Sequence, residues 1–163
     1  MRFFIFSLEL LVAITLGAAS QPASWPVFRG DASLSGNSGS LLASKPSLLW
    51  KFKTGAPVKS SAIIAGGKVF FGSNDTNVYA LDLQTGKKLW GYKTTGSVEA
   101  PGLFSDGKLF IGSTDGFLYA LEAKSGKLLW KYKTDGKILG APNLVVASSR
   151  ESAAESISKK SAA

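Results

Sequence analysis

Carboxylates that recur at a fixed spacing are the side chains of this sequence best suited to chemistry. Asp82 and Glu122 stand 40 residues apart, each at the end of an apolar run and just before a tight turn. Carboxylates in such positions can serve as catalytic acids and bases or as metal ligands. A carboxylate beside a turn can also accept hydrogen bonds from that turn, and we predict this structural role at a solvated edge for both residues.

A second repeated pair of carboxylates, Asp75 and Asp115, lies beside Asn74 and Thr114. A calcium loop places several oxygen ligands at close spacing, and the sequence around these two residues has no such density. We therefore predict that Asp75 and Asp115 form turns and do not bind calcium.

Two residue types that carry much of enzyme chemistry are missing, because the sequence contains no cysteine and no histidine. Their absence excludes disulfides, thiolate nucleophiles, zinc sites of the Cys/His type and every His-dependent triad. We predict no catalytic, cofactor-binding or metal-binding residue and no cofactor, so the chain is not expected to be an enzyme.

The formal net charge is +8, from 19 Lys and Arg against 11 Asp and Glu. A basic balance can indicate nucleic acid or an acidic surface as the partner. The lysines, however, follow a regular pattern, since some flank tryptophans and others sit beside glycines at turns. Basic and aromatic residues do not interleave as they do in nucleic-acid modules. We predict a solvated strand face and no nucleic-acid partner.

The elements that must position these side chains are repeated. Trp50, Trp90 and Trp130 are spaced by 40 residues and lie in the phrases Leu-Trp-Lys-Phe-Lys-Thr, Leu-Trp-Gly-Tyr-Lys-Thr and Leu-Trp-Lys-Tyr-Lys-Thr. A period of about 40 residues is typical of repeat architectures, and the four-stranded propeller blade is the leading candidate.

Each unit contains about four short apolar runs separated by Gly-bearing turns, as an antiparallel meander requires. The expected strands are 49–54, 62–64, 68–71 and 78–83 in the first unit, 89–94, 102–104, 108–111 and 118–123 in the second, and 129–134 and 141–146 in the third. The sequence thus predicts an all-β partial β-propeller of four-stranded antiparallel blades over residues 48–146. It has about two complete blades plus part of a third.

Residues 1–20 have the pattern of a secretory signal peptide, with Arg2, an apolar run and small residues at the end. Cleavage is expected after Ala19 or Ser20. Glu9 interrupts the apolar run, and an uncleaved anchor is the alternative, although the run is shorter than the ~20 residues of a spanning helix. We predict a periplasmic or secreted protein with no stable membrane anchor after cleavage.

Two further segments flank the repeats. Residues 21–47 are expected to form an N-terminal arm with an edge strand, because Pro26 between Trp25 and Val27 cannot donate to a ladder. This arm would ordinarily pair with the last blade of a ring. Residues 147–163 have one large apolar side chain and are expected to be a disordered or weakly helical tail.

Residues 79–90 and 119–130 resemble the repeat of the pyrroloquinoline-quinone (PQQ)-like β-propeller family, of the secreted bacterial type. The family pattern is Ala-x-Asp-x-x-Thr-Gly-x-x-x-Trp. The residues that match this structural repeat motif are Ala80, Asp82, Thr85, Gly86 and Trp90 in one copy, Ala120, Glu122, Ser125, Gly126 and Trp130 in the other, and Trp50 before them. The resemblance implies that each Trp packs between neighbouring blades and that the Thr-Gly turn joins the two strands of a hairpin.

The family includes PQQ-dependent dehydrogenases and periplasmic scaffold propellers. The dehydrogenases use a stacking Trp, a vicinal disulfide and a catalytic Asp near calcium, and no position of this Cys-free sequence matches that site. We therefore predict a non-catalytic, secreted or periplasmic scaffold fragment that binds an unknown protein or polymer partner. The alternatives are the N-terminal remnant of a PQQ-dependent dehydrogenase and an adhesion or assembly module that works as an oligomer.

A propeller ring closes with ~4–8 blades, which two units and part of a third do not reach. The sequence therefore favours a truncated reading frame over a piece that assembles with other chains. Open edges near residues 48–54 and 143–146 predict self-association, because unpaired strands seek partners.

Overall fold

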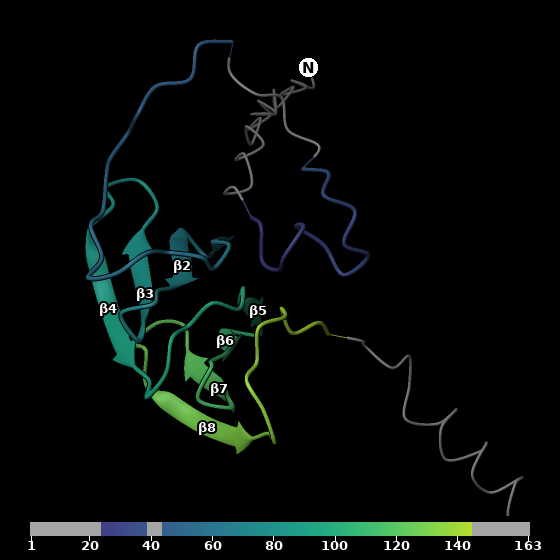
Figure 1. Cartoon of the computed structure of the whole chain (residues 1–163). Coiled ribbons are helices and arrows are strands. Elements are labelled where there is room, and N and C mark those ends of the chain that lie inside the picture. The colour runs from purple at the N-terminus through teal and green to yellow at the C-terminus, as the bar shows by residue number, and fades with distance from the viewer. Residues whose placement is uncertain (1–23, 39–43, 145–163) are drawn as a thin grey trace, which may run out of the picture.

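The computed structural model describes residues 24–38 and 44–144, so the expected signal peptide and C-terminal tail lie outside the described residues. Within them the structure contains eight β-strands in two four-stranded antiparallel sheets, which confirms the expected fold class (Figure 1). We call the first sheet blade one and the second blade two. The strands of blade one are β1 (Ile63–Ala65), β2 (Lys68–Gly72), β3 (Asn77–Asp82) and β4 (Lys88–Lys93), and those of blade two are β5 (Leu103–Ser105), β6 (Lys108–Gly112), β7 (Phe117–Glu122) and β8 (Leu128–Lys133).

The two blades are built alike, down to their register. Ala80 pairs with Trp90 in blade one and Ala120 with Trp130 in blade two, and a bulge follows each alanine. The first hairpin of each blade turns through two residues with positive φ, Gly66 and Gly67 in blade one and Asp106 and Gly107 in blade two. Turns of this kind match the twist of the strands that they join.

The structure differs from the sequence expectation in where a blade begins. The Trp-bearing strand is the fourth and outermost strand of its sheet, and it does not open the unit. Residues 49–54, expected to be the first strand, form no strand. Trp50 and Phe52 are nevertheless half-buried while Lys51 and Lys53 are exposed, so the alternation reflects packing on blade one without ladder partners.

The main hydrophobic core lies between the two blades. Blade one contributes Phe70, Val78 and Trp90, and blade two contributes Leu109 and Tyr119. A smaller cluster lies on the opposite face of blade one, where Trp50 and Phe52 cover four buried side chains, Val69, Phe71, Tyr79 and Leu81. We call residues 44–62, which supply this cover, the strap.

The N-terminal arm, residues 24–38, runs along the inner strands of both blades (Figure 1). Trp25 forms a bridge with Ile64 of β1, and Val27 forms one with Leu103 of β5. Within the described residues the arm thus bridges the two blades that follow it. The last blade of a ring, with which such an arm would ordinarily pair, is not among these residues, so that expectation stays a prediction. In residues 24–38 and 44–144 no helix has the length and apolarity needed to cross a bilayer.

Candidate functional site

The turn after β3 uses the first of the repeated carboxylates. Asp82 Oδ1 accepts hydrogen bonds from the backbone N–H of Gln84 (3.1 Å) and from both the N–H and the hydroxyl of Thr85 (2.8 Å each). The N–H of Gly86 donates to the carbonyl oxygen of Asp82 at 2.9 Å. Hydrogen bonds from Thr85, first its hydroxyl and then its N–H, lower the pKa of the exposed Asp82 carboxyl.

Blade two repeats this turn with Glu122, Ser125 and Gly126. The Ser125 hydroxyl donates to Glu122 Oε2, and the Gly126 N–H donates to the carbonyl oxygen of Glu122 at 2.8 Å. The structure thus brings the acidic, hydroxyl and glycine positions of the motif together in both copies. Their geometry closes a hairpin and leaves each carboxylate facing its own turn.

The second pair of carboxylates has a wider role than the sequence indicated. Asp75 accepts the N–H of Asn77, which is a turn contact, but it also accepts the hydroxyl of Tyr79 (2.8 Å) and the N–H of Gly55 in the strap (2.8 Å). It therefore ties blade one to the preceding segment. A Tyr four residues after each Asp in both repeats is the sequence signal that could have revealed this.

Asp115 makes the same set of contacts between the two blades. It accepts the Tyr119 hydroxyl (2.7 Å), the N–H of Phe117 and both the N–H and hydroxyl of Thr95, which follows β4. Burial raises the pKa of the Asp115 carboxyl, but these hydrogen bonds outweigh it and the net pKa is lowered. Burial and then the hydrogen bond to Asp115 raise the pKa of Tyr119.

Because the pKa of Asp115 is lowered on folding, its contribution to stability is present above its ordinary pKa of 3.8 and is lost as the pH falls through the folded value. We expect Asp115→Asn to lower the free energy of unfolding at neutral pH by about 1.5–3 kcal/mol, the range for hydrogen bonds to charged groups. The deficit should begin to shrink below about pH 4, where the unfolded chain takes up the proton, and should be gone once the pH falls below the lowered pKa of the folded Asp115 carboxyl. Urea unfolding across pH measures this, with Asp106→Asn in an exposed turn as the control. A deficit that does not change with pH would contradict the carboxylate role.

The tryptophans join successive units through one repeated contact. The Trp90 Nε1–H of β4 donates to the carbonyl oxygen of Ala123 in blade two at 3.1 Å, and Trp90 is 8% exposed. Its ring lies on Gly126, where an added Cβ would come within 2.6 Å of the ring. The Ser-Gly turn of blade two is thus a socket for Trp90.

Trp50 of the strap repeats this contact on blade one. Its Nε1–H donates to the carbonyl oxygen of Leu83 at 3.0 Å, and its ring covers Gly86. Trp130 of β8 differs from both, because it is 45% exposed. Trp130 therefore has the same position in the repeat as Trp90, but within the described residues no following blade packs on it. Ala80 and Ala120, opposite Trp90 and Trp130, are fully buried, which lets the sheets pack closely there.

The recurring carboxylates do not gather into one cluster. Across residues 24–38 and 44–144, no three His, Cys, Asp or Glu side chains lie close enough to hold a metal ion together. Each recurring carboxylate instead accepts hydrogen bonds in its own turn or at a contact between units.

Repeated antiparallel blades, joined by a Trp ring lying on the glycine turn of the next unit, define the class of β-propeller repeat proteins. A family model described as outer membrane protein assembly factor BamB matches residues 20–103 and 93–156. These matches cover most of the chain, which therefore belongs to the PQQ-like repeat β-propeller family, as the motifs predicted. No curated protein sequence matches the chain.

Two dehydrogenases are among the solved structures that share this fold. The quinohemoprotein alcohol dehydrogenase ADHIIG of Pseudomonas putida HK5 is 24% identical over 77% of this chain and 22% of its own, with a TM-score of 0.66. A europium-containing methanol dehydrogenase is 25% identical over 78% of this chain and 27% of its own, with a TM-score of 0.65. BamB from Moraxella catarrhalis is 28% identical over 52% and 26%, with a TM-score of 0.48. The chain spans about a quarter of the length of these structures.

Proposed function

We propose that this chain is a non-catalytic, extracytoplasmic β-propeller repeat protein that acts as a scaffold for a protein or polymer partner. The observation that carries the proposal is that the repeated carboxylates are engaged in structural hydrogen bonds. Asp82 and Glu122 accept hydrogen bonds inside their turns, and Asp75 and Asp115 hold the strap and the blade junction together. Carboxylates held in this way stabilise the fold, and they are poorly placed to take a proton from a substrate or to bind a metal ion.

The family description supports the same role. The matching family model is described as an outer membrane protein assembly factor, and an assembly factor acts by contacting other proteins. An extracytoplasmic location agrees with that description and with the signal peptide predicted over residues 1–20. The alternative, a remnant of a PQQ-dependent dehydrogenase, draws on the dehydrogenases with the same fold, but at about 25% identity the likeness supports the fold more than the activity.

The two functions are separated by a cofactor experiment. We expect the purified chain with PQQ, calcium and an electron-accepting dye to oxidise alcohols and aldoses no faster than the protein-free mixture. We also expect PQQ to cause no saturable quenching of tryptophan fluorescence. An active quinoprotein alcohol dehydrogenase is the positive control. Dye reduction that depends on both PQQ and the chain would overturn the proposal in favour of the dehydrogenase.

Export and partner contact form the second test. In bacterial cells that express the full chain, we expect the mature protein in the periplasmic fraction or the medium, with a mass that fits cleavage after Ala19 or Ser20. In-cell crosslinking should give a discrete adduct with an envelope protein or polymer. Retention in the cytoplasm with an intact leader would contradict the location, and crosslinking that yields no adduct would contradict the scaffold role.

A further inference from the structure

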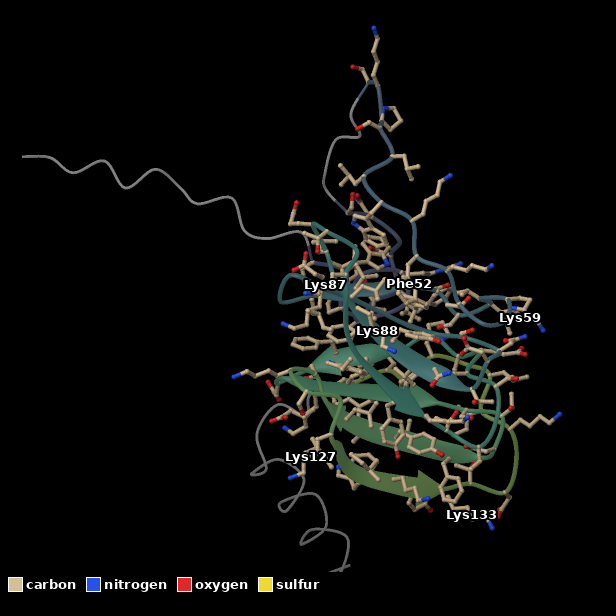
Figure 2. The ribbon with its side chains drawn as sticks, turned by 90° about the vertical axis from the view of Figure 1, so that its left-hand side faces the viewer. Phe52, Lys59, Lys87, Lys88, Lys127 and Lys133 are labelled. Carbon is tan, nitrogen blue, oxygen red and sulfur yellow. The ribbon has the colours of Figure 1, made fainter. Side chains whose placement is uncertain are left out.

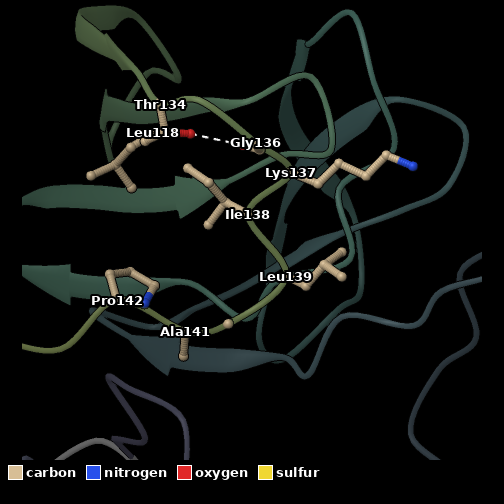
Figure 3. A pocket seen from close by; sticks show the side chains of 9 residues that line it. Leu118, Thr134, Gly136, Lys137, Ile138, Leu139, Ala141 and Pro142 are labelled. Carbon is tan, nitrogen blue, oxygen red and sulfur yellow. Dashed lines mark hydrogen bonds between the residues drawn. The ribbon is translucent and has the colours of Figure 1, made fainter.

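The surface that the described residues leave open is the far face of blade two. Trp130 is 45% exposed and Tyr132 is 66% exposed, although the equivalent Trp90 and Tyr92 of blade one are buried and half-buried. Leu118, the cross-strand partner of Tyr132, also lines an open groove of about 510 Å³. In this groove the Ile138 side chain points toward Leu118, whereas Lys137 and Leu139 point the other way (Figure 3). We call this surface the Trp130 face; it is formed by Leu118, Trp130, Tyr132, Ile138 and Pro142.

The Trp130 face of blade two is built like the face of blade one that packs on blade two. Thr134 donates from its N–H and hydroxyl to the carbonyl oxygen of Gly116 (2.7 and 2.9 Å), as Thr94 does to Thr76 (2.8 and 2.9 Å). The Thr134 hydroxyl also lies 2.8 Å from the carbonyl oxygen of Gly136, again as in blade one. The loop that shapes the face is therefore already in the conformation that the inter-blade junction uses.

The junction between the blades shows what such a face binds. Trp90 lies in the Gly126 socket, and the Tyr92 and Tyr119 rings are 5.6 Å apart. On the blade-two side, the junction buries Leu109, Ile111, Tyr119 and Leu121. The matching positions of blade one, 40 residues earlier, are Val69, Phe71, Tyr79 and Leu81, the cluster that the strap covers. The chain therefore carries both halves of one interface on opposite faces.

The strap is held on blade one by two aromatic side chains and by separate hydrogen bonds, among them those from the Gly55 N–H to Asp75 and from the Asn74 N–H to the Pro57 carbonyl oxygen. Trp50 lies in the Gly86 socket and Phe52 packs 5.4 Å from Tyr79, which copies the Tyr92–Tyr119 contact with a single segment. Residues 49–54 form no strand, so no ladder holds the strap on blade one. Figure 2 shows Phe52 at one end of the stack of sheets and Lys133, on β8, at the other.

We propose that a second copy of this chain docks head to tail, with its Trp130 face replacing the strap on blade one. The Trp130 ring enters the Gly86 socket of the other copy, its Nε1–H donates to the Leu83 carbonyl oxygen, and Tyr132 lies against Tyr79. Continuity with the internal junction fixes this geometry. Such a contact is heterologous, so further copies add in the same way. The interface does not depend on the proposed scaffold function.

One position of this interface is poorly matched. Thr95 donates its hydroxyl to Asp115 at the internal junction, but the equivalent residue next to the Trp130 face is Asp135. In the docked pair, Asp135 would face the carboxylate of Asp75, and like charges repel. The contact between copies is therefore weaker than the internal junction, and Asp135→Thr supplies the missing donor.

Sedimentation velocity of the full mature chain over a range of concentrations tests the proposal. Trp50→Ala empties the Gly86 socket and should strengthen self-association about tenfold or more, because the strap no longer competes. Trp130→Ala should weaken it about tenfold or more, as truncation of a buried aromatic anchor does. The double variant should associate as weakly as Trp130→Ala alone. Asp135→Thr, an exposed change that leaves the fold intact, should strengthen association by severalfold.

Each other outcome overturns the proposal. If Trp130→Ala weakens association while Trp50→Ala and Asp135→Thr leave it unchanged, copies meet through two Trp130 faces and not head to tail. If the wild type and Asp135→Thr both remain monomers at high concentration, no second copy docks and another segment of the chain covers the face. Near-ultraviolet circular dichroism checks that Trp50→Ala stays folded. If Trp50→Ala is unfolded, the comparison of Asp135→Thr with the wild type decides the test.

Discussion

Replacing Trp90 by alanine is expected to lower the free energy of unfolding by about 3–5 kcal/mol, the range for truncating a buried aromatic side chain. Trp90 is 8% exposed, its ring fills the Gly126 socket, and its Nε1–H donates to the Ala123 carbonyl oxygen across the blades. The substitution removes the apolar contact and leaves that carbonyl without its donor. Urea unfolding followed by circular dichroism measures the change in a dilute sample.

Trp130→Ala is the matched control, since Trp130 has the same place in the repeat but is 45% exposed. We expect it to cost the isolated chain about 1 kcal/mol or less, as changes on an open surface do. A Trp90→Ala variant with an unchanged unfolding midpoint would show that Trp90 is not a core residue. Equal losses for the two variants would show that burial at the junction does not decide the role of the tryptophans.

The strands of the blades could be predicted from the sequence because alternation and Gly-bearing turns are local signals. For the eight observed strands, expected and observed ends differ by about one residue; 78–83 was expected, for example, where β3 runs over Asn77–Asp82. The strand expected over 141–146 is wrong for its described part, because residues 141–144 form no strand. The phase of the repeat could not be obtained from periodicity, because a period fixes the content of a unit and not the place where one sheet ends. The tight Thr85-Gly86 turn, compared with the longer connection between β4 and β5, was the signal that β3 and β4 form one hairpin.

The contacts between units were harder to predict than the elements themselves. The turn roles of Asp75 and Asp115 follow from their neighbours in sequence, but their bonds to Gly55 and Thr95 join residues 20 positions apart and depend on how the blades stack. The exposure of Trp130 could not be predicted for the same reason, since it too depends on how the blades stack. Its sequence context equals that of Trp90, and only the presence of a following unit distinguishes the two environments.

The placement of the arm depends equally on tertiary packing. Pro26 marks a short, incomplete strand, and its carbonyl oxygen accepts the N–H of Phe104 at 2.7 Å. Nothing in the residues around Trp25 specifies which sheet the arm meets. Two isolated bridges, one to each blade, place the arm beside the inner strands β1 and β5. From the sequence, the last blade of a ring was the only partner that could be named for the arm.

Replacing Gly126 by alanine is expected to cost about 2–5 kcal/mol in two separable parts. Gly126 has a φ of +74°, a conformation that costs other residues about 1–2 kcal/mol. An added Cβ would also lie 2.6 Å from the Trp90 ring, and overpacking of this kind costs about 1–3 kcal/mol more. Because the ring must move away, we expect the Trp90 fluorescence environment to change as well. Urea unfolding with tryptophan emission as the probe measures both effects.

Gly107 offers a control that separates the two parts of this cost. It has nearly the same φ, +71°, but an added Cβ there meets nothing within 4 Å, so Gly107→Ala should show only the backbone cost of about 1–2 kcal/mol. In a Trp90→Ala background the clash at Gly126 disappears, and the cost of Gly126→Ala should fall to that of Gly107→Ala. If Gly126→Ala costs no more than Gly107→Ala in the wild-type background, the socket does not hold the Trp90 ring. The junction between the blades would then depend on other contacts, and the docking of a second copy through Trp130 would lose its structural basis.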